Sequence, residues 1–74
     1  MKLYNEILKE LRNDLDLTQK NVAEHLKITK QQYSLYETGQ RELPLHHLIT
    51  LCKFYNVSAD YILGLPKNMN YPER

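Results

Sequence analysis

Residues 30–38, KQQYSLYET, combine amide, hydroxyl and ammonium side chains with two tyrosines. In a helix that turns by about 100° per residue, Tyr33 and Tyr36 share one side of this segment with the stem of Glu37. That side is predicted to face the protein core. The opposite side is predicted to face outward and consists of Lys30 at its start, Gln31, Ser34, Leu35 and Thr38.

The outward groups match the chemistry of base edges in the major groove of DNA. A glutamine amide can pair bidentately with N6 and N7 of adenine, a lysine can donate to guanine, and a Leu or Thr methyl can meet the thymine methyl. A carboxylate here would be repelled by phosphate, and this face has none. We therefore expect the outward face of residues 30–38 to contact DNA.

The ends of this helix are marked by local sequence. Thr29 followed by Gln32 forms a capping box, which predicts a helix that begins at Lys30. Gly39 suits the left-handed position that follows a helix, so the helix is predicted to stop near Thr38. Only eight or nine residues, about two and a half turns, would be helical.

A second short helix precedes it. Thr18 is the expected N-cap of a helix that runs to about Leu26, and Gln19 at its start is placed to hold a backbone phosphate. Only Lys27 and Ile28 then remain before the next cap, so the two helices must cross at a steep angle. Such a pair cannot bury its apolar side chains alone.

Three further helices are predicted to supply the rest of the core. They cover residues 3–14, a segment from Pro44 to Asn56, and residues 59–63 between the cap Ser58 and Gly64. The side chains expected to face inward from the first two of these helices are Leu3, Ile7, Leu8, Leu11, Leu15, Leu48, Leu51, Cys52 and Tyr55. On the first helix, the side chains expected to face water include Asn5 and Arg12.

Composition is compatible with one small all-α domain. The chain has 74 residues, 42% of them hydrophobic and 26% charged, and its formal net charge of +1 does not by itself indicate a nucleic-acid partner. We predict a compact five-helix bundle over residues 1–65 and a tail, residues 66–74, that is flexible or docks in a dimer. The chain has one cysteine and no apolar run of about 18 residues, and acidic residues near its start argue against a signal peptide. A cytoplasmic location is therefore expected.

Residues 17–63 resemble the helix-turn-helix domain of the phage repressor and Cro class, the XRE family of bacterial regulators. The matching features are Leu17-Thr18-Gln19, Ala23-Glu24, Glu37-x-Gly39, Pro44 and Asn56-Val57-Ser58. The resemblance implies a lambda-repressor-like DNA-binding fold in which residues 30–38 are the recognition helix. Two positions depart from the family pattern: Lys27 stands where the turn often has glycine, and Leu35 where a second base-reading polar residue is often found.

The resemblance also implies site residues. The implied base contacts are Lys30, Gln31, Ser34 and Leu35, and the implied DNA backbone contacts are Thr18, Gln19, Gln32, Gln40 and Arg41. The leading hypothesis is a sequence-specific transcriptional regulator, a repressor, that binds an inverted repeat as a homodimer. Its dimer interface is predicted from apolar residues near the C-terminus, namely Tyr61, Ile62, Leu65 and Met69.

The sequence also has to be considered as a protein-interaction module, a metal-binding protein or an enzyme. The alternative is a protein-interaction module, such as an antitoxin, that binds a partner protein through the last two helices. His25, His46 and His47 lack the i, i+4 spacing of a chelating pair, so they are interpreted as surface histidines rather than metal ligands. Asp14 and Asp16 are interpreted as helix-ending residues. No motif for an enzyme, a cofactor or a metal was found.

Overall fold

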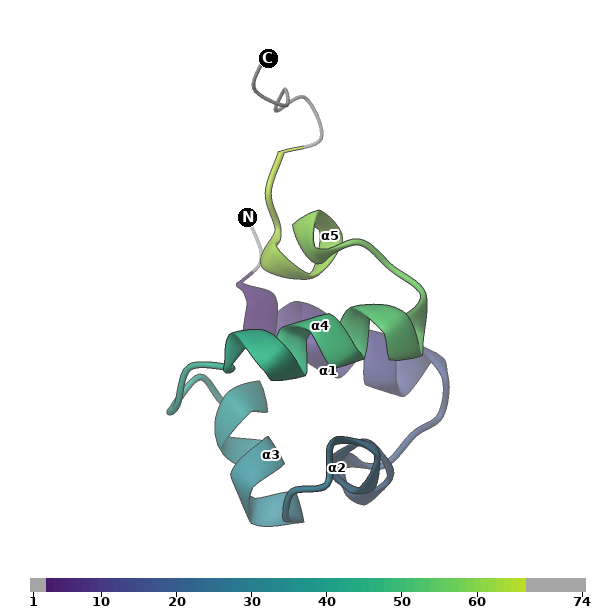
Figure 1. Cartoon of the computed structure of the whole chain (residues 1–74), viewed down its shortest axis with the longest axis vertical. Coiled ribbons are helices and arrows are strands. Elements are labelled where there is room, and N and C mark those ends of the chain that lie inside the picture. Colours follow the sequence, from purple (N-terminus) through teal and green to yellow (C-terminus); the bar gives the residue numbers. More distant parts are fainter. Residues whose placement is uncertain (1–2, 67–74) are drawn as a thin grey trace.

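The computed structural model describes residues 3–66, which form five α-helices (Figure 1). In Figure 1, α4 and α1 run across the middle of the molecule, α2 and α3 lie below them, and α5 lies above. No strand occurs among residues 3–66, so the predicted all-α, five-helix fold is confirmed. The helices are α1 (Tyr4–Asp14), α2 (Gln19–Leu26), α3 (Lys30–Glu37), α4 (Leu45–Tyr55) and α5 (Ala59–Leu63).

Each helix contributes one of the largest fully buried side chains of the core. These are Leu8, Val22, Tyr33, Leu51 and Ile62, in the order α1 to α5. A short helix is marginal in water on its own, and most helical stability in proteins comes from packing an apolar face. No helix of this domain is therefore expected to be stable apart from the others.

The starts of α2 and α3 are fixed by two reciprocal capping boxes. Thr18 Oγ1 accepts from the Asn21 N–H at 3.0 Å, and Asn21 Oδ1 accepts from the Thr18 N–H at 3.0 Å. Thr29 and Gln32 form the same pair of bonds at 3.1 and 3.3 Å. The predicted caps are confirmed, although the sequence analysis had not recognised the role of Asn21.

The turn between α2 and α3 is as short as predicted. Lys27 adopts left-handed backbone angles, φ 60° and ψ 40°, which place it where glycine would be least strained. The Ile28 N–H donates to the Ala23 carbonyl at 3.0 Å, which closes the end of α2. Figure 1 shows α2 nearly end-on beside α3, so the two helices cross steeply.

Two leucines at the ends of α1 were placed on the wrong side of the helix. Leu3 and Leu15 were expected in the core but are exposed, with 63% and 57% of their surface accessible. Leu3 is the N-cap of α1 and Leu15 its C-cap, so neither continues the helical phase that buries Ile7 and Leu8. The apolar spacing therefore extended the inward stripe one residue too far at each end.

His47 was also predicted incorrectly, because it is buried rather than on the surface. It lies four residues before Leu51, which places both side chains on the inward face of α4. Its ring lies 6.0 Å from the ring of Tyr36, centroid to centroid. His25 and His46 are exposed, as predicted.

The predicted dimer residues near the C-terminus separate into different environments. Ile62 is completely buried, so its prediction as an interface residue was wrong. The single turn of α5 packs against α1 and α4, and Ile62 is the α5 residue that this packing buries. Tyr61 and Leu65 are exposed, by 53% and 39%, whereas Met69 lies outside the described residues, as does all of the predicted tail except Pro66.

None of the helices within residues 3–66 combines the length and the apolar character needed to span a membrane.

Candidate nucleic-acid interface

The α3 helix presents one face to the core and another to solvent. Tyr33 and Tyr36 are buried, and Lys30, Gln31 and Gln32 are exposed. Ser34 and Leu35 are partly buried at the edge of the outward face. The predicted orientation of the helix, with its phenol rings inward and its amides outward, is therefore confirmed.

Glu37, the only carboxylate of α3, is removed from the outward face by a buried ion pair. Arg12 of α1 donates to it twice, from Nε to Oε2 at 2.7 Å and from Nη2 to Oε1 at 3.1 Å. The third nitrogen of the guanidinium, Nη1, donates to the Leu17 carbonyl at 2.8 Å. Arg12 had been expected to face water, and this prediction was wrong because its planar fork matches the carboxylate bidentately.

The same carboxylate also holds a predicted DNA contact. Gln19 Nε2, at the start of α2, donates to Glu37 Oε1 at 3.3 Å. Burial alone would raise the pKa of Glu37, but hydrogen bonds from Arg12 and Gln19 contribute to holding it below its ordinary value. Glu37 therefore remains ionised and links α1, α2 and α3.

This network was not predicted from the sequence, although the position of Glu37 in α3 indicates that its carboxylate needs a partner. Glu37 was placed on the tyrosine side of α3, and a buried carboxylate requires a cation or several hydrogen-bond donors. The periodicity of one helix cannot identify a partner that lies 25 residues away, which is the separation of Arg12 and Glu37. Asn5, also expected in water, is partly buried and donates to the Glu37 backbone carbonyl at 3.3 Å.

The starts of α2 and α3 open onto a shared concave surface. One hollow of this surface is lined by Gln19, Lys30, Gln31 and Ser34. A neighbouring hollow is lined by Arg12, Leu17, Thr18, Gln19, Lys20 and Lys30. Because Gln19 and Lys30 line both hollows, the predicted base-contact and backbone-contact residues meet at one surface. Two exposed ammonium groups, those of Lys20 and Lys30, make it attractive to anions.

The remaining predicted backbone contacts are also accessible. Thr18 and Gln32 are exposed, and their capping oxygens accept bonds from backbone N–H groups, which leaves the Gln32 amide hydrogens free to donate. Gln40 and Arg41 are exposed in the loop that follows α3. Polar donors thus lie at both ends of α3, which is about 12 Å long.

Two buried phenols lie in the core behind this surface. The hydroxyls of Tyr33 and Tyr55 have no hydrogen-bond partner among residues 3–66. Burial raises the pKa of Tyr55 to about 12 and also raises the pKa of Tyr33. Both phenols are therefore neutral near pH 7. Within residues 3–66, no group of three or more His, Cys, Asp or Glu side chains is arranged to hold a metal ion.

Comparison with known proteins agrees with the fold. Residues 8–62 match the family model described as Helix-turn-helix. Two crystal structures share the fold: a transcriptional regulator from Listeria innocua, and the P22 c2 repressor in complex with a synthetic operator. For the first, the TM-score is 0.82 at 22% identity, covering 93% of this chain and 64% of that one. For the second, the TM-score is 0.78 at 24% identity, covering 85% and 96%.

Curated relatives from Bacillus subtilis are more similar in sequence. The HTH-type transcriptional regulator YobD is 41% identical over 63 residues, which are 85% of this chain and 56% of that protein. The HTH-type transcriptional regulator ImmR is 44% identical over 57 residues, or 77% and 45%. The chain thus spans about half the length of these relatives. It belongs to the XRE-type helix-turn-helix family of DNA-binding transcriptional regulators, which is not a family of enzymes.

Proposed function

We propose that this chain is a cytoplasmic repressor that binds an inverted-repeat operator in double-stranded DNA as a homodimer, with α3 in the major groove. The observation that carries the proposal is the burial of Glu37 and its pairing with Arg12. The only carboxylate of the predicted recognition helix is buried and paired with Arg12, so the exposed face of α3 offers donors and methyl groups without a negative charge. Such a face suits base edges that lie between two rows of phosphates.

The proposed base contacts are Lys30, Gln31, Ser34 and Leu35. Gln31 is exposed, and its amide can pair with an adenine. Lys30 at the start of the helix can donate to guanine, and Ser34 can donate or accept. Leu35 is partly buried beside them, which suits contact with a thymine methyl.

The proposed backbone contacts are Thr18, Gln19, Gln32, Gln40 and Arg41. At the start of α2, the first N–H groups lack acceptors within the helix, and the helix dipole favours an anion there. Gln19 is already oriented by its bond to Glu37, and its second amide hydrogen remains available for a phosphate. Contacts of this kind fix the position of the protein on DNA without reading sequence.

The proposed dimer interface uses Tyr61 and Leu65. Both are exposed beside a hollow that a second copy could fill. The hollow is lined by Ile7, Ser58, Asp60, Tyr61, Gly64 and Leu65. The proposal requires that a two-fold axis near this surface set the two α3 helices about 34 Å apart, the spacing of successive major grooves.

Leu65→Ser is expected to weaken self-association by about a hundredfold, because a two-fold dimer loses two buried leucines that contribute about 1.5 kcal/mol each. Sedimentation across a concentration series measures the change. Leu45→Ser is the matched control, since Leu45 is even more exposed, at 70%, but lies at the start of α4 and does not line this hollow. Equal weakening by both variants would contradict the proposed interface.

Selection of bound sites from a random duplex pool, followed by a salt series, tests the function. We expect the pool to converge on an inverted repeat with half-site centres about 10 base pairs apart. On random duplex, the logarithm of affinity should fall with the logarithm of salt by about 0.9 for each phosphate neutralised. A pool that does not converge would contradict the proposal.

A protein-interaction module, such as an antitoxin, remains the second candidate. It is favoured by Leu45 and Ile49, which lie one helical turn apart on α4 and are exposed by 70% and 49%. This candidate requires a partner protein that binds α4 and α5, with only incidental affinity for DNA. Failure of the selection together with retention of a partner by this surface would support it.

A further inference from the structure

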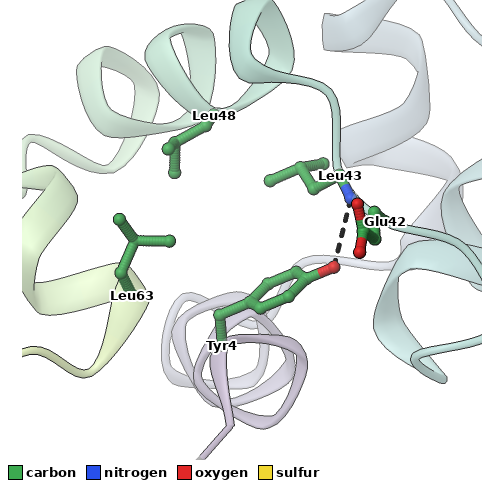
Figure 2. Close-up of a pocket in the computed structure, with 5 residues that line it drawn as sticks. All are labelled: Tyr4, Glu42, Leu43, Leu48 and Leu63. Atoms are coloured by element: carbon green, nitrogen blue, oxygen red, sulfur yellow. Dashed lines mark hydrogen bonds between the residues drawn. The ribbon is translucent and has the colours of Figure 1, made fainter.

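The loop between α3 and α4, residues 38–44, is held at both ends by two adjacent residues of α1. At its start, Asn5 Nδ2 donates to the backbone carbonyl of Glu37 at 3.3 Å. At its far end, the backbone N–H of Leu43 donates to the Tyr4 hydroxyl at 3.1 Å (Figure 2). The exposed side chains of Gln40 and Arg41 lie between these two attachments.

The first half of the loop is also fixed by the end of α3. Gly39 adopts a positive φ of 80°, and the N–H groups of Gln40 and Arg41 both donate to the Leu35 carbonyl, at 3.0 and 3.2 Å. A Cβ atom at Gly39 would lie 3.5 Å from the side-chain amide of Asn5, so α1 packs directly against this backbone. The path of the chain through Arg41 is therefore well defined.

The second half of the loop is held by the partly buried Leu43 side chain, which packs against the core, and by the Pro44 carbonyl, which accepts from the N–H groups of His47 and Leu48. A cavity of about 160 Å³ lies against it, lined by Tyr4, Glu42, Leu43, Leu48 and Leu63. Figure 2 shows the Tyr4 ring at one wall of this cavity and its hydroxyl bonded to the Leu43 backbone. The Tyr4 hydroxyl adds a side-chain bond from α1 to the backbone at this end of the loop.

We infer that Tyr4 and Asn5 are positioning residues for DNA binding, which hold the loop so that Gln40 and Arg41 meet the DNA backbone. The inference rests on the proposed function. An arginine on a loose loop must be ordered when it binds phosphate, and that ordering reduces affinity. A loop that is already attached to α1 avoids this loss. Tyr4 and Asn5 need not touch DNA for this effect.

A double-mutant cycle tests the inference. Tyr4→Phe removes only the hydroxyl, and it is combined with the loop variant Gln40→Ala/Arg41→Ala. Thr50→Val is the matched control, because it also removes one side-chain bond to a backbone group, from Thr50 Oγ1 to the His46 carbonyl at 3.0 Å, but within α4. Affinity for random duplex across a salt series and the free energy of unfolding are measured for each protein.

Tyr4→Phe is expected to lower the affinity for random duplex by about three- to tenfold, the range that one hydrogen bond allows, and to reduce the salt slope. When Tyr4→Phe is added to the loop variant, the affinity should change by less than about twofold. The change that Tyr4→Phe makes in the free energy of unfolding should be the same in the loop variant and in the unsubstituted protein. Thr50→Val should leave the affinity and the salt slope unchanged.

Two other outcomes are distinguishable. If the unsubstituted protein binds DNA with a steep salt slope but the affinity losses of Tyr4→Phe and the loop variant simply multiply, the positioning role is wrong and the proposed function stands. If the unsubstituted protein shows no salt-dependent affinity for duplex DNA, the proposed function and this inference both fail.

Discussion

Arg12→Met is expected to lower the free energy of unfolding by about 3 kcal/mol, because it leaves a buried carboxylate without its cation. The side chain of Glu37 is only 2% exposed and that of Arg12 only 12%, so water can replace little of the lost interaction. A domain of this size is expected to be stable by roughly 4–11 kcal/mol. The loss is therefore a large fraction of the total, and urea denaturation near pH 7 measures it.

The double variant Arg12→Met/Glu37→Met separates the loss of charge pairing from the loss of packing. Methionine fills much of the volume of both side chains, and no buried charge is left without a partner. We expect the double variant to recover most of the stability that the single variant loses. If both variants lose the same amount, the unpaired carboxylate is not the cause.

The pH dependence of stability gives a second readout of the same pair. In the unsubstituted protein the pKa of Glu37 lies below 4.5, its ordinary value, so its contribution is complete above about pH 4.5 and is lost as the pH falls through the lowered pKa. In Arg12→Met the bonds from Arg12 are lost while burial stays, so the pKa of Glu37 is expected to rise relative to its value in the unsubstituted protein. The stability difference between the unsubstituted protein and Arg12→Met should therefore become smaller as the pH falls from neutral, because protonation of Glu37 then relieves the unpaired charge in the variant; His47, whose pKa burial lowers, contributes alike to both proteins.

The helix boundaries could be predicted from sequence because they depend on neighbouring residues. Thr18 and Thr29 cap helices within three residues of themselves, and Asn56 and Gly64 end helices in left-handed conformations, as expected. The orientation of α3 was also predictable, since Tyr33 and the groups opposite it follow the helical period.

The errors concern contacts between residues that are distant in the chain. Periodicity tells which side of a helix is apolar, but it does not tell which neighbour covers that side. The pairing of Arg12 with Glu37 therefore escaped prediction, as did the burial of Ile62 against α1 and α4. In α5 the limit is acute, because a helix of five residues shows too little of a period to separate its core side from its exposed side.

Gln31→Ala is expected to reduce the free-energy difference between binding the operator and binding its single-base variants by about 1–3 kcal/mol at one or two base pairs. The variant should still bind random duplex. The orientation of α3 supports this expectation, because Gln31 is exposed beside Lys30 and Ser34 in one hollow. Competition between the selected operator and single-base variants measures the discrimination at each position. The free energy of unfolding should change little, because the substitution is on the surface and alanine favours a helix.

Gln19→Ala is the matched comparison, since it removes an amide from the same hollow but from the start of α2. It should weaken binding to all duplexes alike, because a phosphate contact carries no sequence information. The variant also loses the bond from Gln19 to Glu37, so its unfolding must be measured beside its binding. If the two variants lose affinity in the same pattern across operator variants, the separate roles assigned to α2 and α3 are wrong. A loss confined to particular base pairs for Gln31→Ala alone would support α3 as the helix that reads sequence.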